Sequence, residues 1–178
     1  LFRKFKKWGF DAVELLIEDP RHIDAGLIRR QLDRHGRACL AWAAGGGADR
    51  DLRGSPASQR RGIKFLCSLL DQMVTLSCPM LVGPVYSYAG RAGAATPAER
   101  RRQWRTVVKN LKTVCAYAEA RGKVVCVEPL NRFETDFLNT AEQGIQLIKD
   151  VNSPALKLHL DTFHTNIEEK QLDQAILQ

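Results

Sequence analysis

Five short apolar runs, each separated from the next by a helix-type pattern, constrain the fold more than any other feature of this sequence. The runs are rich in β-branched or apolar residues and are bounded by Gly, Pro, Asn or Asp; they occupy residues 10–17, 37–44, 79–86, 123–130 and 155–162. Between them, apolar residues recur at helical spacing, most clearly over residues 56–76 and 97–121. Strict alternation of strand and helix predicts a parallel sheet with right-handed crossovers.

Capping signals support the predicted helices. A hydroxyl or amide side chain precedes each of several helical patterns, with Pro at the first helical position or with Glu or Gln three residues later. The signal recurs at Ser55-Pro56, Thr96 with Glu99, Thr140 with Gln143, and Asn166 with Glu169. We therefore expect helices to begin at these four places.

Two architectures fit the alternation: an open doubly wound sheet and a (β/α)8 TIM barrel. An open sheet of this kind usually has a Gly-rich phosphate turn after its first strand, and no such turn follows residues 10–17. Lys157, His159 and Asp161 alternate with leucines, so they share one face of their strand, and a polar barrel interior would tolerate them there. Parity places Glu14 inward as well, and we expect Glu14 and Lys157 to be buried partners.

The barrel is expected to be incomplete. A whole (β/α)8 barrel needs about 250 residues, whereas this chain has 178. We predict one partial TIM-barrel domain over residues 1–178, with about five of eight strands. Residues 1–9 read as the end of a first helix, so strand 1 and strands 7 and 8 are expected to lie outside the chain.

Composition narrows the class of protein. The sequence is 44% hydrophobic and 26% charged, as in a soluble globular domain, and no apolar run approaches the roughly 20 residues of a membrane helix. With no visible secretory signal, we expect a cytoplasmic protein without a membrane partner. The net charge of +7 comes largely from arginines on predicted helix surfaces without interleaved aromatics, so we expect no nucleic-acid partner. The five cysteines form no CxxC pair, which favours reduced, buried thiols.

Polar residues gather where the last two predicted strands end. Glu128 follows one strand and Asp161 the next, so neighbouring parallel strands would bring two carboxylates to within roughly 5 Å. Two like charges at that distance repel unless a positive group lies between them, and a divalent cation such as Mn²⁺, Mg²⁺ or Co²⁺ is the simplest solution. A structural pair bridged by Arg132 is the alternative.

The residues around these carboxylates carry a family resemblance. The segments VEPLNRFETDFLNTAEQG and LHLDTFHTNIEEK resemble the ketose 3-epimerases, the D-tagatose and D-psicose 3-epimerase group of the xylose isomerase-like TIM barrels. The resemblance implies a metal-dependent enzyme, usually with Mn²⁺ or Co²⁺, that inverts C3 of a free ketose and assembles as a dimer or tetramer. It implies that Glu128 binds the metal and exchanges the C3 proton, that Asp161 is a second ligand, and that Glu134 and His164 hydrogen-bond the O1 and O2 end of the sugar.

The implied chemistry suits these residue types. A proton next to a carbonyl is acidic when the enediolate is stabilised, and a cation with an adjacent carboxylate base provides that. The second base, a further His and an Arg are expected outside the chain. Trp42 and Tyr86 end strands on the same rim, where they would line the sugar pocket or pack in the core. His159 is expected to be an interior hydrogen bonder, and glycines 45–47 a flexible loop.

Three other functions remain open at the level of sequence. An aldose–ketose or hydroxypyruvate-type isomerase would share the first half of the reaction. An abasic-site endonuclease-like hydrolase shares the superfamily and would suit the basic charge, but it uses more His ligands than the predicted strands offer. An inactive, truncated binding protein would follow from the missing strands.

Overall fold

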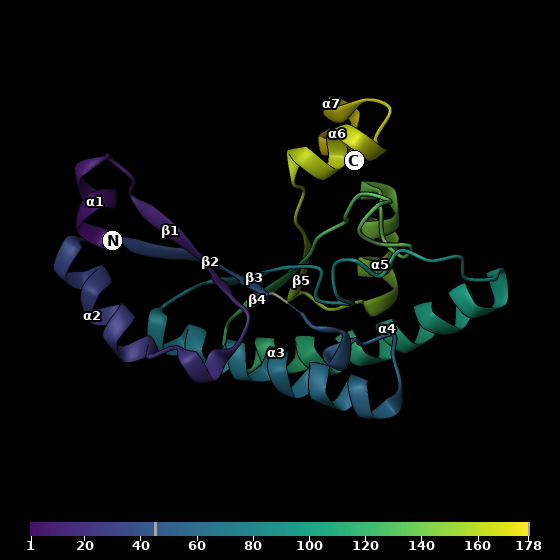
Figure 1. The fold of residues 1–178 in the computed structure, drawn as a ribbon, viewed down its shortest axis with the longest axis horizontal. Coiled ribbons are helices and arrows are strands. Elements are labelled where there is room, and N and C mark those ends of the chain that lie inside the picture. The colour runs from purple at the N-terminus through teal and green to yellow at the C-terminus, as the bar shows by residue number, and fades with distance from the viewer. Residues whose placement is uncertain (45, 178) are drawn as a thin grey trace.

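A computed structural model describes residues 1–44 and 46–177 and contains one five-stranded parallel sheet (Figure 1). The strands are β1 (Ala12–Ile17), β2 (Ala38–Ala44), β3 (Met80–Gly83), β4 (Val124–Val127) and β5 (Leu156–Leu158), and each predicted run contains one of them. Their order in the sheet is β1-β2-β3-β4-β5. Strands that follow one another along the chain are therefore neighbours throughout, as in a TIM barrel and unlike a doubly wound sheet, whose strand order reverses.

The helices lie largely on one side of this sheet. They are α1 (Phe2–Lys7), α2 (Ala25–His35), α3 (Pro56–Leu76), α4 (Pro97–Glu119), α5 (Ala141–Val151), α6 (Thr162–Glu168) and α7 (Leu172–Leu177), with short 3₁₀ turns η1 (Pro20–His22) and η2 (Ala48–Arg50). In Figure 1, α2, α3 and α4 run beneath the sheet, while α6 and α7 stand beyond the end of β5. The chain thus forms an arc of sheet with a helical outer layer.

Three of the four predicted helix starts are confirmed. The Ser55 hydroxyl accepts a hydrogen bond from the Ser58 amide at the start of α3. Reciprocal capping boxes begin α4 and α5; they join Thr96 to Glu99 and Thr140 to Gln143. These starts were predictable because a cap needs only residues that are close in sequence.

The fourth predicted start, Asn166 with Glu169, is wrong. The capping residue of helix α6 lies five residues earlier, at Asp161, whose carboxylate accepts a hydrogen bond from the Phe163 amide, so the helix begins at Thr162. Asn166 therefore lies inside α6. The Glu169 carboxylate instead accepts a hydrogen bond from the Ala141 amide at the start of α5, at 2.7 Å.

The two faces of the sheet have separate apolar clusters. On the helix side, an in-register row crosses all five strands and packs into the main core; it consists of Leu15, Trp42, Leu81, Val125 and Leu156. On the opposite face, Ala41, Val82 and Cys126 form a small buried cluster that Met80 and Val124 flank. The period-two assignment of the strand residues is confirmed, because both clusters follow the predicted alternation.

The predicted buried pair of Glu14 and Lys157 is wrong. Both residues lie on the face opposite the helices, since Glu14 pairs with Ala41 and Lys157 with Cys126 in the sheet register. Both are nevertheless exposed, on the two edge strands β1 and β5, and no ion pair joins them within the described part of the chain. The alternation of side chains along each strand predicted the correct face of the sheet for both residues. It did not predict their neighbours, because strands at opposite edges of an arc do not touch.

A buried ion network joins the loops that follow β2, β3 and β4. The Arg53 guanidinium, fully buried, donates to Asp136 Oδ1 at 2.5 Å and to Ser87 Oγ at 3.1 Å. Arg91 forms an ion pair with Asp51, whose other carboxylate oxygen accepts a hydrogen bond from the Arg53 amide. The network fixes these three loops relative to one another at the end of the sheet where Glu128 lies.

Other expectations concern the chain as a whole. None of the helices in the described residues is long and apolar enough to cross a membrane. All five cysteines are free thiols, and all but the half-buried Cys67 are buried, as predicted. The predicted glycine loop falls partly on Gly45, which lies outside the described residues.

Candidate active site

Glu128 lies directly after β4 and is held by its backbone. Its amide donates to the Gly83 carbonyl at 3.1 Å, which extends the pairing of β3 and β4 by one residue. The buried Tyr86 hydroxyl donates to the Glu128 carbonyl at 2.9 Å and also reaches the Leu138 carbonyl. Glu128 as a whole is only 9% exposed. A carboxylate in so little water needs a positive partner or a proton.

Asp161 follows β5 and caps α6. Its Oδ1 accepts a hydrogen bond from the Phe163 amide at 2.7 Å, and its carbonyl accepts one from the Thr165 amide at 2.9 Å. One carboxylate oxygen is therefore committed to the helix, while the other remains free to bind a ligand. The cap also explains why the side chain is directed toward Glu128, because the helix start fixes its orientation.

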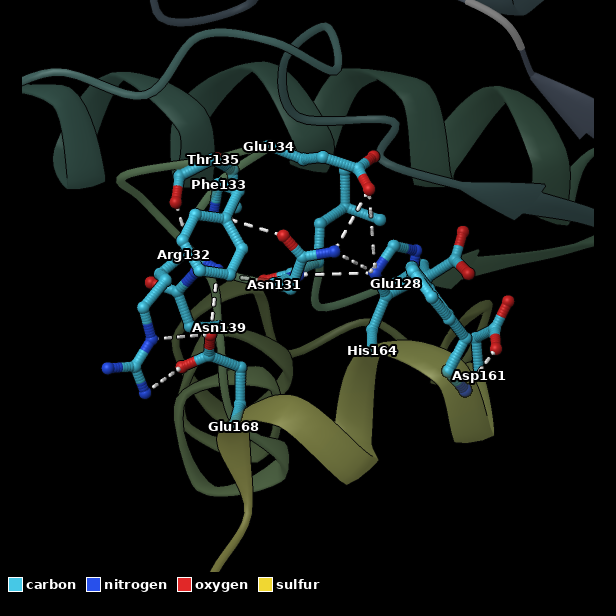
Figure 2. A network of polar contacts seen from close by, with 12 residues as sticks. Glu128, Asn131, Arg132, Phe133, Glu134, Thr135, Asn139, Asp161, His164 and Glu168 are labelled. Atoms are coloured by element: carbon cyan, nitrogen blue, oxygen red, sulfur yellow. Dashed lines mark hydrogen bonds and ion pairs between the residues drawn. The ribbon is translucent and has the colours of Figure 1, made fainter.

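The two carboxylates converge with the His164 imidazole, as Figure 2 shows. One potential ligand atom from each of Glu128, Asp161 and His164 lies within 4.8 Å of the other two. The predicted close approach of the two carboxylates is confirmed. Carboxylate oxygens, here those of Glu128 and Asp161, suit Mn²⁺, Mg²⁺ or Co²⁺, so the residues present fit a divalent cation.

The alternative of an Arg132 bridge between the two carboxylates is wrong. Arg132 instead holds Glu168: its amide and Nε donate to Glu168 Oε1 at 2.7 and 2.9 Å, and Nη2 donates to Oε2 at 3.1 Å. In the described residues, no Arg or Lys forms an ion pair with Glu128 or Asp161. The His159 imidazole, 3.5 Å from Glu128 Oε1, is the one titratable basic group paired with either carboxylate in the described residues, and a cation bound between Glu128 and Asp161 would relieve their repulsion directly.

The Arg132–Glu168 clamp itself was not predicted. It joins the segment after β4 to the last turn of α6, and the Arg132 guanidinium lowers the pKa of the Glu168 carboxyl below its usual value. Helix α6 carries His164 and begins at Asp161, so the clamp helps to hold both beside Glu128. The sequence does contain two adjacent acidic residues, at 168 and 169, that could have indicated such contacts. Their partners could not be identified, because they lie about 30 residues away in sequence.

Glu134 and His164 lie side by side, with Asn131 between them. Glu134 Oε1 is 4.0 Å from His164 Nδ1, and the Asn131 side-chain amide donates to that oxygen at 2.9 Å. The His164 side chain is 10% exposed and that of Glu134 is 39% exposed. The two residues expected to contact a ligand thus share one corner of the site, and Asn131, given no role from the sequence, connects them.

His159 lies deeper, below Glu128. Its Nδ1 is 3.5 Å from Glu128 Oε1, and the nearby carboxylate raises the pKa of His159 above its usual value. The expectation of an interior hydrogen bonder is met only in position, because the side chain is 35% exposed and Nδ1 has no hydrogen-bond partner among the described residues.

Trp42 and Tyr86 belong to the core. Both are fully buried, Trp42 in the helix-facing row and Tyr86 against Phe137 with its hydroxyl on the Glu128 carbonyl. Of the two alternatives for these aromatic residues, ordinary packing is the correct one. Tyr86 still serves the site, because it holds the backbone that carries Glu128.

Comparison with known proteins agrees with this geometry. Residues 2–178 match the family described as "Xylose isomerase-like TIM barrel". The chain is 32% identical to a D-psicose 3-epimerase of Ruminiclostridium cellulolyticum over 97% of this chain and 60% of the relative. It is 35% identical to an L-ribulose 3-epimerase of Mesorhizobium japonicum over 94% of this chain and 56% of the relative.

Solved structures agree as well. The crystal structure of D-allulose 3-epimerase from Methylomonas sp. in complex with D-allulose superposes with a TM-score of 0.91 at 29% identity and covers 99% of this chain. The chain spans about 60% of the length of that structure and of the R. cellulolyticum relative. The consecutive strand order, the carboxylates at the strand ends and these matches lead to one conclusion: the chain belongs to the xylose isomerase-like TIM barrel family.

Proposed function

We propose that this chain carries part of the active site of a divalent-cation-dependent ketose 3-epimerase, an isomerase that inverts C3 of a free ketose through an enediolate. The observation that carries the proposal is the convergence of Glu128, Asp161 and His164 within 4.8 Å at the carboxyl ends of β4 and β5. Functional groups of TIM barrels lie at that end of the strands. The similarity to D-psicose, L-ribulose and D-allulose 3-epimerases supports the same reaction.

In this proposal each residue has a distinct role. Glu128 and Asp161 would hold the cation, and the bound cation would supply Lewis acidity toward the sugar oxygens. The Glu128 carboxylate takes the C3 proton. It is buried beside the site, so bulk water has little access to act as the base in its place. Glu134 and His164 hydrogen-bond the O1 and O2 end of the sugar and so fix which carbon faces Glu128.

The finer assignments rest on the resemblance and on ligand chemistry. Mn²⁺ is our proposed cation, with Co²⁺ or Mg²⁺ as substitutes, since carboxylate oxygens dominate the donor set. We propose a cytoplasmic protein whose partner is the small-molecule sugar, with neither nucleic acid nor membrane, and a homo-oligomeric full-length form. The second base, a further His and an Arg would come from the part of the full-length protein that corresponds to the unmatched parts of the relatives.

Deuterium labelling tests the reaction. The 178-residue chain and a version completed with the unmatched parts of the R. cellulolyticum relative are loaded with Mn²⁺ and incubated with D-fructose or D-tagatose in deuterated water. We expect NMR to find deuterium at C3 of the sugar together with the C3 epimer, at least in the completed version. Deuterium at C1 would instead identify an aldose–ketose isomerase, and absence of label from both proteins would contradict the enzymatic proposal.

A matched pair of variants assigns the base. Glu128→Gln keeps the shape of the side chain but removes its basicity, and we expect C3 exchange to fall by about 10²- to 10⁴-fold. Glu142→Gln, on the exposed surface of α5, makes the same chemical change away from the site and is expected to leave the rate unchanged. Equal rates for the two variants would show that Glu128 is not the base.

A further inference from the structure

Asn131 is a buried residue whose side-chain orientation is fixed by the turn that contains it. It is 2% exposed, and its Oδ1 accepts a hydrogen bond from the Phe133 amide at 3.0 Å. An oxygen that accepts from a backbone amide leaves the side-chain nitrogen on the other side. That nitrogen, Nδ2, donates to Glu134 Oε1 at 2.9 Å and lies 2.9 Å from His164 Nδ1.

His164 Nδ1 therefore faces two donors. The Asn131 backbone amide donates to it at 3.2 Å, in addition to the Nδ2 group (Figure 2). A backbone amide can only donate, so Nδ1 must present its lone pair. A neutral imidazole carries one proton, and that proton must then be on Nε2. Glu134 Oε1 lies 4.0 Å from Nδ1, beyond hydrogen-bond distance, so a proton on Nδ1, in the other tautomer or in the imidazolium ion, would point at the two N–H groups.

We propose that Asn131 is a positioning residue that holds His164 as the neutral Nε2–H tautomer and, with the same amide, orients Glu134. The inference rests on the proposed function for its catalytic meaning, though not for its geometry. The Nε2–H group is a hydrogen-bond donor without a free lone pair. His164 therefore donates to a ligand oxygen, while Glu128 and Asp161 are left as cation ligands in the described part of the chain.

The pairing with Glu134 gives the arrangement a second consequence. His164 offers a donor, and Glu134, its Oε1 occupied by Asn131 Nδ2, offers the acceptor capacity of its remaining oxygen. One amide thus sets a donor and an acceptor side by side, which suits two adjacent oxygens of a polyol. Losing the side-chain amide would release Glu134, which has no other side-chain hydrogen-bond partner in the described residues, and would leave His164 held by the backbone amide of residue 131 alone.

The tautomer is measured directly by ¹⁵N NMR of the metal-free protein with labelled histidine. We expect His164 Nδ1 to give the signal of an unprotonated nitrogen and Nε2 that of an N–H nitrogen. Asn131→Asp keeps the backbone amide beside Nδ1 but replaces the Nδ2 donor with an oxygen that only accepts, and we expect a measurable fraction of His164 to carry a proton on Nδ1 in this variant. A protonated Nδ1 in the wild type, or an unchanged Nδ1 signal in Asn131→Asp, would overturn the inference.

Kinetics of the C3-exchanging protein provide the second readout. Asn131→Ala is expected to lower kcat/KM by about 10- to 100-fold, the usual effect of losing a partner that orients a site residue. Asn139→Ala is the matched control, because Asn139 supports the same loop by donating to the Leu130 and Thr135 carbonyls at 2.8 and 3.0 Å without touching His164. Equal losses in the two variants would mean that Asn131 supports only the loop.

The two proposals fail in different ways. If neither protein exchanges C3 but the NMR results are as expected, the epimerase proposal fails while the tautomer assignment stands. If exchange is found but Nδ1 is protonated in the wild type, the epimerase proposal stands and the positioning role of Asn131 is refuted.

Discussion

At the scale of single residues, Asp161 combines two tasks in one carboxylate. One oxygen accepts the Phe163 amide and starts α6, and the other is free beside Glu128. The capped helix end fixes the side chain, so the second oxygen reaches the site without further loss of conformational entropy. The two tasks are separable, because Asn caps a helix as well as Asp does but carries no charge.

Variants of Asp161 test this separation. Asp161→Asn should change the free energy of unfolding by less than about 0.5 kcal/mol, since the cap remains. It should weaken Mn²⁺ binding by more than about 10-fold. Loss of a residue that only hydrogen-bonds a metal ligand already lowers metal affinity by about that factor, and loss of a ligand itself should cost more. Asp161→Ala should lose both the ligand and about 1 kcal/mol of stability. Urea denaturation and Mn²⁺ titration measure the two effects, and wild-type affinity in Asp161→Asn would contradict its role as a ligand.

At the scale of elements, two ion networks hold the loops and α6 around the site. The Arg132–Glu168 clamp joins the segment after β4 to the end of α6, and the Arg53 network joins the loops after β2, β3 and β4. They differ in burial: the Arg132 side chain is 63% exposed, whereas that of Arg53 is 0% exposed. We therefore expect the first to contribute modestly to stability and the second to be costly to break.

The clamp should make stability depend on pH. The pKa of Glu168 is lowered in the folded state, so its contribution is fully present above the unfolded value of about 4.3 and is lost as the pH falls through the folded pKa. Glu168→Gln should cost about 1 kcal/mol near pH 7, at the low end for charged hydrogen bonds because Arg132 is exposed. The difference from wild type, measured by urea denaturation, should shrink below pH 4. A difference that stays constant down to pH 3 would contradict the clamp.

The Arg53 network should respond differently to single and double changes. Arg53→Met leaves Asp136, which is 11% exposed, without its partner, and we expect a loss of about 3 to 5 kcal/mol. Changing Asp136→Leu as well removes the unpaired charge and should recover much of that loss. Denaturation of the single and double variants tests this, and strictly additive losses would show that the two residues do not interact.

At the scale of the whole molecule, the sheet separates a large core from a small one. The helix side contains most of the buried side chains, whereas on the opposite face the buried cluster of the described residues consists of Ala41, Val82 and Cys126. Edge residues of that face are open to water; Leu16, for example, is 68% exposed. Stability should therefore be uneven. The cluster of Ala41, Val82 and Cys126, called the inner cluster below, should open more readily than the helix-facing core.

Thiol reactivity reports this difference. In the native 178-residue chain, the half-buried Cys67 should react first with a thiol reagent. Cys126 of the inner cluster should follow, and the helix-facing Cys39, Cys78 and Cys115 should react only on global unfolding. Mass spectrometry of peptides after timed labelling gives the order. Reaction of Cys115 before Cys126 would show that the inner cluster is not the weaker one.

The sequence predicted those features of the site that depend on where strands end. Glu128 and Asp161 meet because the carboxyl ends of neighbouring parallel strands share one edge of the sheet, and that follows from the alternation of strand and helix. The capping boxes at Thr96 and Thr140 were predictable because they are local. The choice of a barrel over an open sheet needed two further observations, the absence of a Gly-rich phosphate turn after the first strand and the polar face of Lys157, His159 and Asp161.

Side-chain partners were decided by the tertiary structure alone. Arg132 binds Glu168 rather than the two carboxylates, Glu14 and Lys157 remain apart on opposite edge strands, and Asn131 joins Glu134 to His164. Periodicity states which face a residue occupies, but not which atoms meet across 30 residues of intervening chain. The sequence by itself therefore determined the architecture and the two converging carboxylates, whereas hydrogen-bond partners depend on distances and angles that only the packed loops and helices fix.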